Sequence, residues 1–281
     1  MLNDWFYSHS TWEVMFVVCS VIVGLSLGGL YLFNRFVDWE SREKDTSMVG
    51  LSYALAGGIY AIVISFVAVG VYENLDKADG IATAEANYLS SIVFDSAGLP
   101  ADLALRVRGN VDAYIDTVTE KEWRSQQAYQ MDDSNFEEGW SELRKISRDL
   151  NDFEPATAGQ ATVKLEMIQN IDELFSARHA RLLAANAHLP DAVWQMMIFG
   201  LLMVLVYVCL FGPHSFKIHM AVTGLTMFTI GLVFTLIIAM DYPFRGDVSV
   251  DDEAYLGTKE VAASVFGKFA EHPPAAAHEQ K

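Results

Sequence analysis

The sequence predicts an all-α, polytopic membrane protein with four transmembrane helices and a helical extramembrane domain inserted between the second and the third. Four runs of about 20 residues or more contain no Asp, Glu, Lys or Arg, and an acidic segment separates them into two pairs. A helix of about 20 apolar residues can cross the roughly 30 Å of hydrocarbon in a bilayer. The four runs cover residues 14–33, 49–72, 192–213 and 220–240.

These patterns divide the chain into four parts. Residues 1–72 hold the first helix pair, residues 73–191 form the acidic helical domain, and residues 192–240 hold the second pair. Residues 241–281 are expected to form an acidic, partly flexible C-terminal tail.

The charge lies outside the four runs, where water can hydrate it. The formal net charge is −17, and residues 73–191 contain 22 acidic and 11 basic side chains. This balance argues against nucleic acid as a partner, because nucleic-acid binding needs clustered Lys and Arg. An acidic surface is either a simple aid to solubility or a means to concentrate cations. The two cysteines, Cys19 and Cys209, lie in apolar runs, so no disulfide framework is expected.

Small residues recur every fourth position in the first two runs. This spacing lets a neighbouring helix approach closely. We expect the first two helices to pack on each other here, although a contact between copies of the chain would use the same residues. The residues are Ser20, Gly24 and Gly28 in the first run and Gly50, Ala54 and Gly58 in the second.

Bulky side chains follow in the second run at Ile59, Ile62 and Phe66, of which the last two lie one turn apart on one face. Such a stripe usually faces lipid or the protein core. The alternative is an apolar constriction of a pore, which gates by losing its water. In the fourth run Thr223, Thr226, Thr229 and Thr235 are expected to bond to their own helix or to neighbouring helices.

The segment between the pairs has the apolar periodicity of helices, with breaks at Pro100, 132–134 and 155–159. We expect a small helical bundle, partly continuous with the second and third spans. The stripes are Leu75, Ala78, Ala82, Leu89 and Val93; Leu103, Val107, Val111, Tyr114 and Val118; Phe136, Trp140, Leu143, Ile146, Leu150 and Phe153; and Leu165, Ile168, Ile171, Phe175, His179 and Leu182.

Basic residues bear on the orientation. The two short loops carry Arg35, Arg42, Lys44 and Lys217, whereas the opposite side spreads its basic residues over much more chain. The positive-inside rule therefore mildly favours an extracytoplasmic helical insert.

Several polar clusters are candidate sites, each with a simpler interpretation. Arg178, His179 and Arg181 are expected to form the polar flank of a helix near lipid headgroups. We expect Glu85 and the pair Glu120 and Glu122 to lie on solvated helix faces.

The rest of the sequence contains no motif that predicts an enzyme. His214 and His219 do not complete a metal coordination shell. No phosphate-binding loop, nucleophile elbow or dinucleotide fingerprint is present, so we expect no enzyme activity, no metal and no cofactor.

Several short motifs, taken in order, resemble the bestrophin-like family of bacterial four-span membrane proteins, known chiefly as a domain of unknown function. The resemblance covers about residues 10–257. The motifs are the segment 82–86 with Glu85, then Leu99-Pro100, Tyr114, Glu122-Trp123, Arg181-Leu182, Leu189-Pro190, Trp194, and the segment 241–246 with Asp241, Tyr242, Pro243, Phe244, Arg245 and Gly246.

The resemblance implies a remote relation to bestrophins, which are oligomeric anion channels with a pore lined by the second span. Ile62 and Phe66 are the positions that match the apolar neck of that pore. The negative charge of this chain is a departure, because an acidic entrance suits cations better than chloride. Bestrophins also hold their helical domain in the cytoplasm, opposite to the side that the basic residues favour.

Two functions from different classes therefore stand side by side. The first is an oligomeric ion channel in the bacterial inner membrane, a homo-oligomer surrounded by lipid. The second is a non-conducting accessory or scaffolding subunit whose helical insert binds a protein partner.

Overall fold

The structure is a computed structural model that describes residues 2–37, 46–212 and 215–271. Every regular element within these ranges is helical. The chain divides into two compact units. The first comprises Met1–Leu75 with Ala187–Ser249, and the second comprises Asp76–Asn186 with Val250–Lys281.

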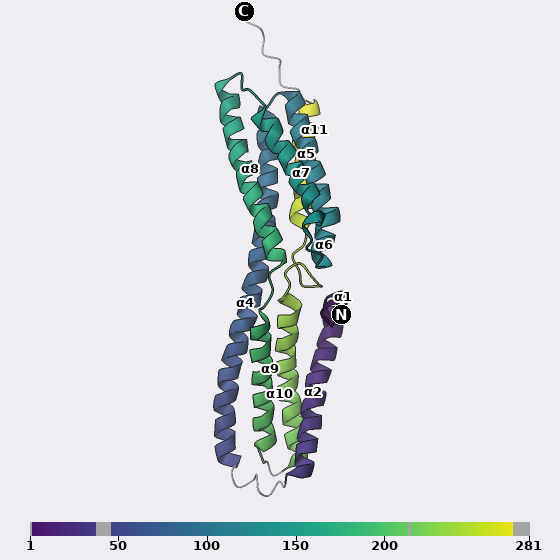
Figure 1. Cartoon of the computed structure of the whole chain (residues 1–281), viewed down its shortest axis with the longest axis vertical. Coiled ribbons are helices and arrows are strands. Elements are labelled where there is room, and N and C mark those ends of the chain that lie inside the picture. Colours follow the sequence, from purple (N-terminus) through teal and green to yellow (C-terminus); the bar gives the residue numbers. More distant parts are fainter. Residues whose placement is uncertain (1, 38–45, 213–214, 272–281) are drawn as a thin grey trace, which may run out of the picture. The chain divides into compact units, whose positions relative to one another are not determined.

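The first unit contains four long apolar helices, and each is long and apolar enough to cross a membrane. They are α2 (Thr11–Phe36), the first part of α4 (Thr46–Asp95), α9 (Asp191–Leu210) and α10 (Phe216–Met240), preceded by the short α1 (Leu2–Ser8) (Figure 1). The prediction of an all-α protein with four helices long and apolar enough to cross a membrane is confirmed for the described residues. Two positively charged residues of the orientation count, Arg42 and Lys44, lie outside the described residues, as do Pro213 and His214.

The ends of α2 and α9 follow local sequence signals. Ser10 and Glu13 form a capping box at the start of α2, where each side chain bonds the other's backbone. Pro190 precedes α9, and its carbonyl accepts hydrogen bonds from the amides of Val193 and Trp194. A proline tolerates this position because its missing N–H would have no partner inside the helix.

Within the first unit α2 packs mainly against α10. The two helices approach closely at Gly231, where an added Cβ would lie 3.0 Å from the Cys19 sulfur and 3.1 Å from its Cα. Of the small residues predicted to join α2 to α4, Ser20, Gly24, Gly28, Ala54 and Gly58 are exposed, and Gly50 instead faces the ring of Phe211. The expectation that these residues pack the first two helices together is therefore wrong within one chain.

The first part of α4 is held against α9 by a buried tyrosine. The Tyr60 hydroxyl donates a 2.7 Å hydrogen bond to the Met197 carbonyl. Its ring lies so close to Gly200 that a Cβ there would overlap the ring. In α10, Thr229 and Thr235 bond the carbonyls of Leu225 and Gly231, so the expected bonding to their own helix is confirmed for these two.

The second unit is a bundle built from the rest of α4 and the helices that follow it (Figure 1). The breaks between them fall where Pro100, residues 132–134 and residues 155–159 predicted them. The elements are η1 (Ser96–Gly98), α5 (Ala101–Thr117), the π-helical turn η2 (Val118–Glu122), α6 (Trp123–Gln127), η3 (Asp133–Asn135), α7 (Glu137–Asn151), α8 (Ala158–Ala185) and α11 (Glu253–Glu271).

Two features of the chain's course differ from the sequence-based expectation. First, α8 ends at Ala185 and a new helix begins at Asp191, whereas α4 is continuous from Thr46 to Asp95 as expected. The third span therefore does not extend α8. The C-terminal segment is shared between the units, since residues 241–249 belong to the first and α11 belongs to the second.

Helix α11 is tied to the bundle of the second unit by polar and ionic contacts. The Thr258 hydroxyl donates a 3.1 Å hydrogen bond to the Ala86 carbonyl and lies 2.9 Å from the Ser90 hydroxyl. Lys259 forms an ion pair with Asp116 on α5.

Candidate functional site

The predicted neck residues lie on one exposed face of α4 in the first unit. Ile59, Ile62 and Phe66 are 66%, 59% and 73% exposed in the single chain. The same stretch of α4 buries Tyr60 and Ile64 in the core of the unit. The helix is therefore anchored on one side and offers a bulky apolar stripe on the other.

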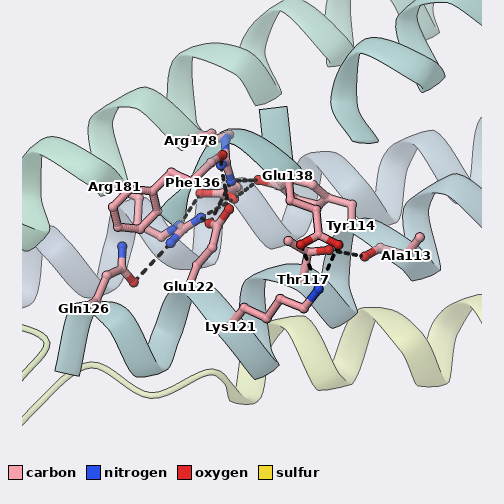
Figure 2. A network of polar contacts seen from close by, with 11 residues as sticks. Ala113, Tyr114, Thr117, Lys121, Glu122, Gln126, Phe136, Glu138, Arg178 and Arg181 are labelled. Atoms are coloured by element: carbon pink, nitrogen blue, oxygen red, sulfur yellow. Dashed lines mark hydrogen bonds and ion pairs between the residues drawn. The ribbon is translucent and has the colours of Figure 1, made fainter. Parts of the chain in front are cut away.

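The second unit buries four charged side chains in one network. The Arg181 Nε donates a 2.7 Å hydrogen bond to Glu85 Oε2, and its Nη2 lies 2.9 Å from Glu122 Oε2. Arg178 donates two bonds to the same glutamate, of 2.8 and 2.6 Å. All four side chains are fully buried. Figure 2 shows both guanidinium groups, from α8, converging on Glu122.

Neutral groups complete the shell around these charges. The Tyr114 hydroxyl donates to Glu85 Oε1 and accepts a 3.1 Å bond from Arg178. The Phe136 carbonyl and the Gln126 side-chain oxygen accept further bonds from Arg178 and Arg181 (Figure 2). The aromatic rings that lie against the guanidinium groups are those of Trp140 and Tyr114 for Arg178, and those of Trp123 and Tyr255 for Arg181.

Two local features bring the groups of the network together. The π-helical turn η2 lies between α5 and α6, and its residues Val118 and Glu122 are buried. A π turn holds an extra residue and so changes which side chains face inward after it. Gly139 on α7 leaves room for the ion pair, because a Cβ there would collide with Glu122 Oε1 and the Arg178 guanidinium.

The buried arginines keep their charge because opposite charges lie beside them. Burial alone lowers the pKa of Arg181, but the Glu85 carboxylate and its other neighbours outweigh burial and hold that pKa well above its ordinary value. Burial and the Glu85 carboxylate raise the pKa values of Tyr114 and Tyr255, so both hydroxyls remain protonated. The arrangement has two cations and two anions that pair with one another, which suits a fixed joint between helices.

The network overturns three expectations. Arg178 and Arg181 are buried rather than part of a polar flank, and Glu85 and Glu122 are buried rather than solvated. Of the predicted cluster only His179 is exposed. Sequence reasoning did not single out Gln126, Gly139 or Tyr255.

A signal for the buried arginines existed in the spacing of α8. Met167, Ile171 and Leu174 form the buried face of this helix, and Arg178 and Arg181 continue it at the next two helical intervals. The predicted stripe over 165–182 shares only Ile171 with this face, and its other members lie beside it. Among its members, Leu165 and His179 are exposed.

The remaining motif residues meet at one end of the first unit. Asp241, at the end of α10, accepts a 2.6 Å bond from the Leu189 amide and a 3.3 Å bond from the Trp194 indole. Pro243 and Phe244 are buried in the loop that follows. Gly246 lies in the same loop with φ +84°, a conformation that favours glycine.

This loop is also tied to the N-terminus of the unit. Arg245 bonds Asp4 at 3.1 Å and lies over the Tyr7 ring. Among the described residues, no group of His, Cys, Asp or Glu has the arrangement of a metal site.

The fold and these motifs define the class as an all-helical protein with four helices apolar enough to span a membrane. A family model for the bestrophin-like domain matches residues 20–255, and the chain therefore belongs to the bestrophin-like family. No curated protein and no solved structure matched the chain.

Proposed function

We propose that the chain is the subunit of an oligomeric ion channel in the bacterial inner membrane and has no enzymatic activity. The observation that carries this proposal is the stripe of Ile59, Ile62 and Phe66 on α4. Several copies that present this stripe to a common axis would enclose an apolar neck, which controls ion flow through its wetting.

The helical unit formed by residues 76–186 and α11 is proposed to lie outside the bilayer. Its surface is acidic and its core contains buried ion pairs, and both features are costly in hydrocarbon. The short loops carry Arg35, Arg42, Lys44 and Lys217, whereas the basic residues on the side of the unit are spread over much more chain. This supports an extracytoplasmic position for the unit.

Two observations bear on which ion the proposed channel conducts. Membership of the family implies an anion, whereas the formal charge of −17 favours cations. The proposed channel is therefore tested with reversal potentials in asymmetric KCl, which separate potassium from chloride permeation.

The purified protein is reconstituted in liposomes and planar bilayers, and its current is recorded. Current that Phe66→Ala alters supports the proposal. No current from folded, oligomeric protein would overturn it and leave the non-conducting accessory subunit, for which a stoichiometric partner in a native purification is the corresponding test.

A further inference from the structure

A groove of about 710 Å³ runs along α2, α9 and α10 in the first unit. This volume lies in the range of small-molecule sites. Val17, Val21 and Leu25 line it from α2, and Ile198 and Leu201 line it from α9. Residues 17–25 extend about 12 Å along a helix, so the apolar part follows the span for roughly two turns.

The groove is open to the surroundings of the membrane helices. Val21, Leu25 and Ile198 are 51%, 70% and 49% exposed. In a bilayer these side chains face hydrocarbon, and an empty apolar groove there would fill with an acyl chain rather than with water.

One end of the groove is polar, and it lies where the spans end. His188, Asp191 and Asp241 line this end, together with the ring of Trp194. Asp191 begins α9 and Asp241 directly follows α10, so both carboxylates are at the level of lipid headgroups. The groove thus has the polarity profile of a single lipid, polar at the end of the span and apolar along it.

The carboxylate of Asp241 determines which headgroup fits. It is only 7% exposed, it accepts two N–H bonds, and no ion pair to it is present among the described residues. Burial raises its pKa. Arg245 forms its ion pair with Asp4, and His188, whose Nδ1 bonds the Leu189 carbonyl, only partly offsets the effect of burial on this pKa. The lining residues include no Lys or Arg.

We propose that this groove binds one phospholipid with a primary-amine headgroup, whose ammonium contacts Asp241 and Asp191 and whose acyl chain lies along α2 and α9. The ammonium supplies the counter-charge that the buried carboxylate lacks, which offsets the cost of burying that charge. A headgroup with a net negative charge would meet two carboxylates instead.

The test uses delipidated full-length protein and native mass spectrometry with phosphatidylethanolamine, phosphatidylglycerol or phosphatidylcholine. We expect one retained phosphatidylethanolamine per chain. Asp241→Asn, which keeps an acceptor for the Leu189 amide, should weaken this binding by about tenfold or more, as expected for a lost charged hydrogen bond. Asp247→Asn, in the same loop, is the control that should bind as the original chain does.

A second variant tests the groove without touching the carboxylate. Ile198→Trp places a larger side chain in the apolar part and should reduce binding of all three lipids. Equal retention of phosphatidylethanolamine and phosphatidylglycerol, or unchanged binding in both variants, would overturn the proposal. Disulfide formation between two Val21→Cys chains with no retained lipid would also overturn it and assign the groove to a second copy.

Discussion

Arg181 on α8 lies 2.7 Å from Glu85 on α4, although 96 positions separate them in the sequence. The pair joins α4, which also carries the predicted pore neck, to α8, the last helix before the third span. Because both side chains are fully buried, neither can exchange its partner for water. The pair is therefore a fixed joint of the second unit.

Removal of one member of this pair should strongly destabilise the second unit. Glu85→Ala leaves Arg181 buried with half of its counter-charge, and we expect a loss of about 3–5 kcal/mol in the free energy of unfolding. Denaturant unfolding of the detergent-solubilised protein, followed by tryptophan fluorescence, measures it. Asp102→Ala, which removes an exposed ion pair with Arg106, is the control and should have little effect. Equal effects of the two variants would contradict a buried joint.

Gly139 should be intolerant of a single added methyl group. In Gly139→Ala the new Cβ collides with Glu122 and Arg178, so α7 must shift or the ion pair must break, at a cost of about 1–3 kcal/mol or more. The matched variant Gly109→Ala adds the same methyl group to α5, where nothing lies within 4 Å. That variant should hold or gain stability, by up to about 1 kcal/mol. A stable Gly139→Ala protein would show that the close approach is not required.

Gly200 plays the equivalent part in the first unit. Gly200→Ala overlaps the Tyr60 ring and should separate α4 from α9, with a loss of about 1–3 kcal/mol that thermal unfolding detects. The loss should shrink when the same change is made in a Tyr60→Leu background, because the ring is then absent. In Gly224→Ala the added Cβ would lie 3.7 Å from the Leu27 side chain, which is an ordinary contact, so this variant should be tolerated. Equal losses in both backgrounds would point to a cause other than the ring.

Stability should depend on pH through Asp241. Burial raises the pKa of this carboxyl above its value in the unfolded chain. Its contribution to stability is therefore fully present below the unfolded pKa and is lost as the pH rises through the folded pKa. In delipidated protein Asp241→Asn should lack this component, so the difference in unfolding free energy between the two proteins should vary with pH. Parallel pH profiles from acid to neutral pH would refute the raised pKa.

Conduction should respond to the stripe on α4 and not to exposed apolar residues in general. Phe66→Ala should raise the basal current, since a smaller side chain widens the neck and favours its wetting. Phe16→Ala on α2 is the matched control, because both phenylalanines are 73% exposed. An equal change of current in both variants would assign Phe66 to contact with lipid.

Much of the fold follows from short stretches of sequence. A helix such as α9 needs only an uninterrupted apolar run after Pro190, because the backbone bonds within the helix satisfy its polar groups in hydrocarbon. The breaks near Pro100 and residues 155–159 are likewise local. These features depend on neighbours along the chain, and sequence reasoning recovered them.

The four apolar runs, the helical character of the insert and the family could all be predicted from the sequence. The packing of α2 against α10 at Gly231 became visible only in the folded chain, as did the common burial of Arg178, Arg181, Glu85 and Glu122. Taken alone, each of these charged residues is of a type that usually lies on a solvated helix face. Its burial depends on an opposite charge from a distant segment, and such a match exists only once the helices are packed.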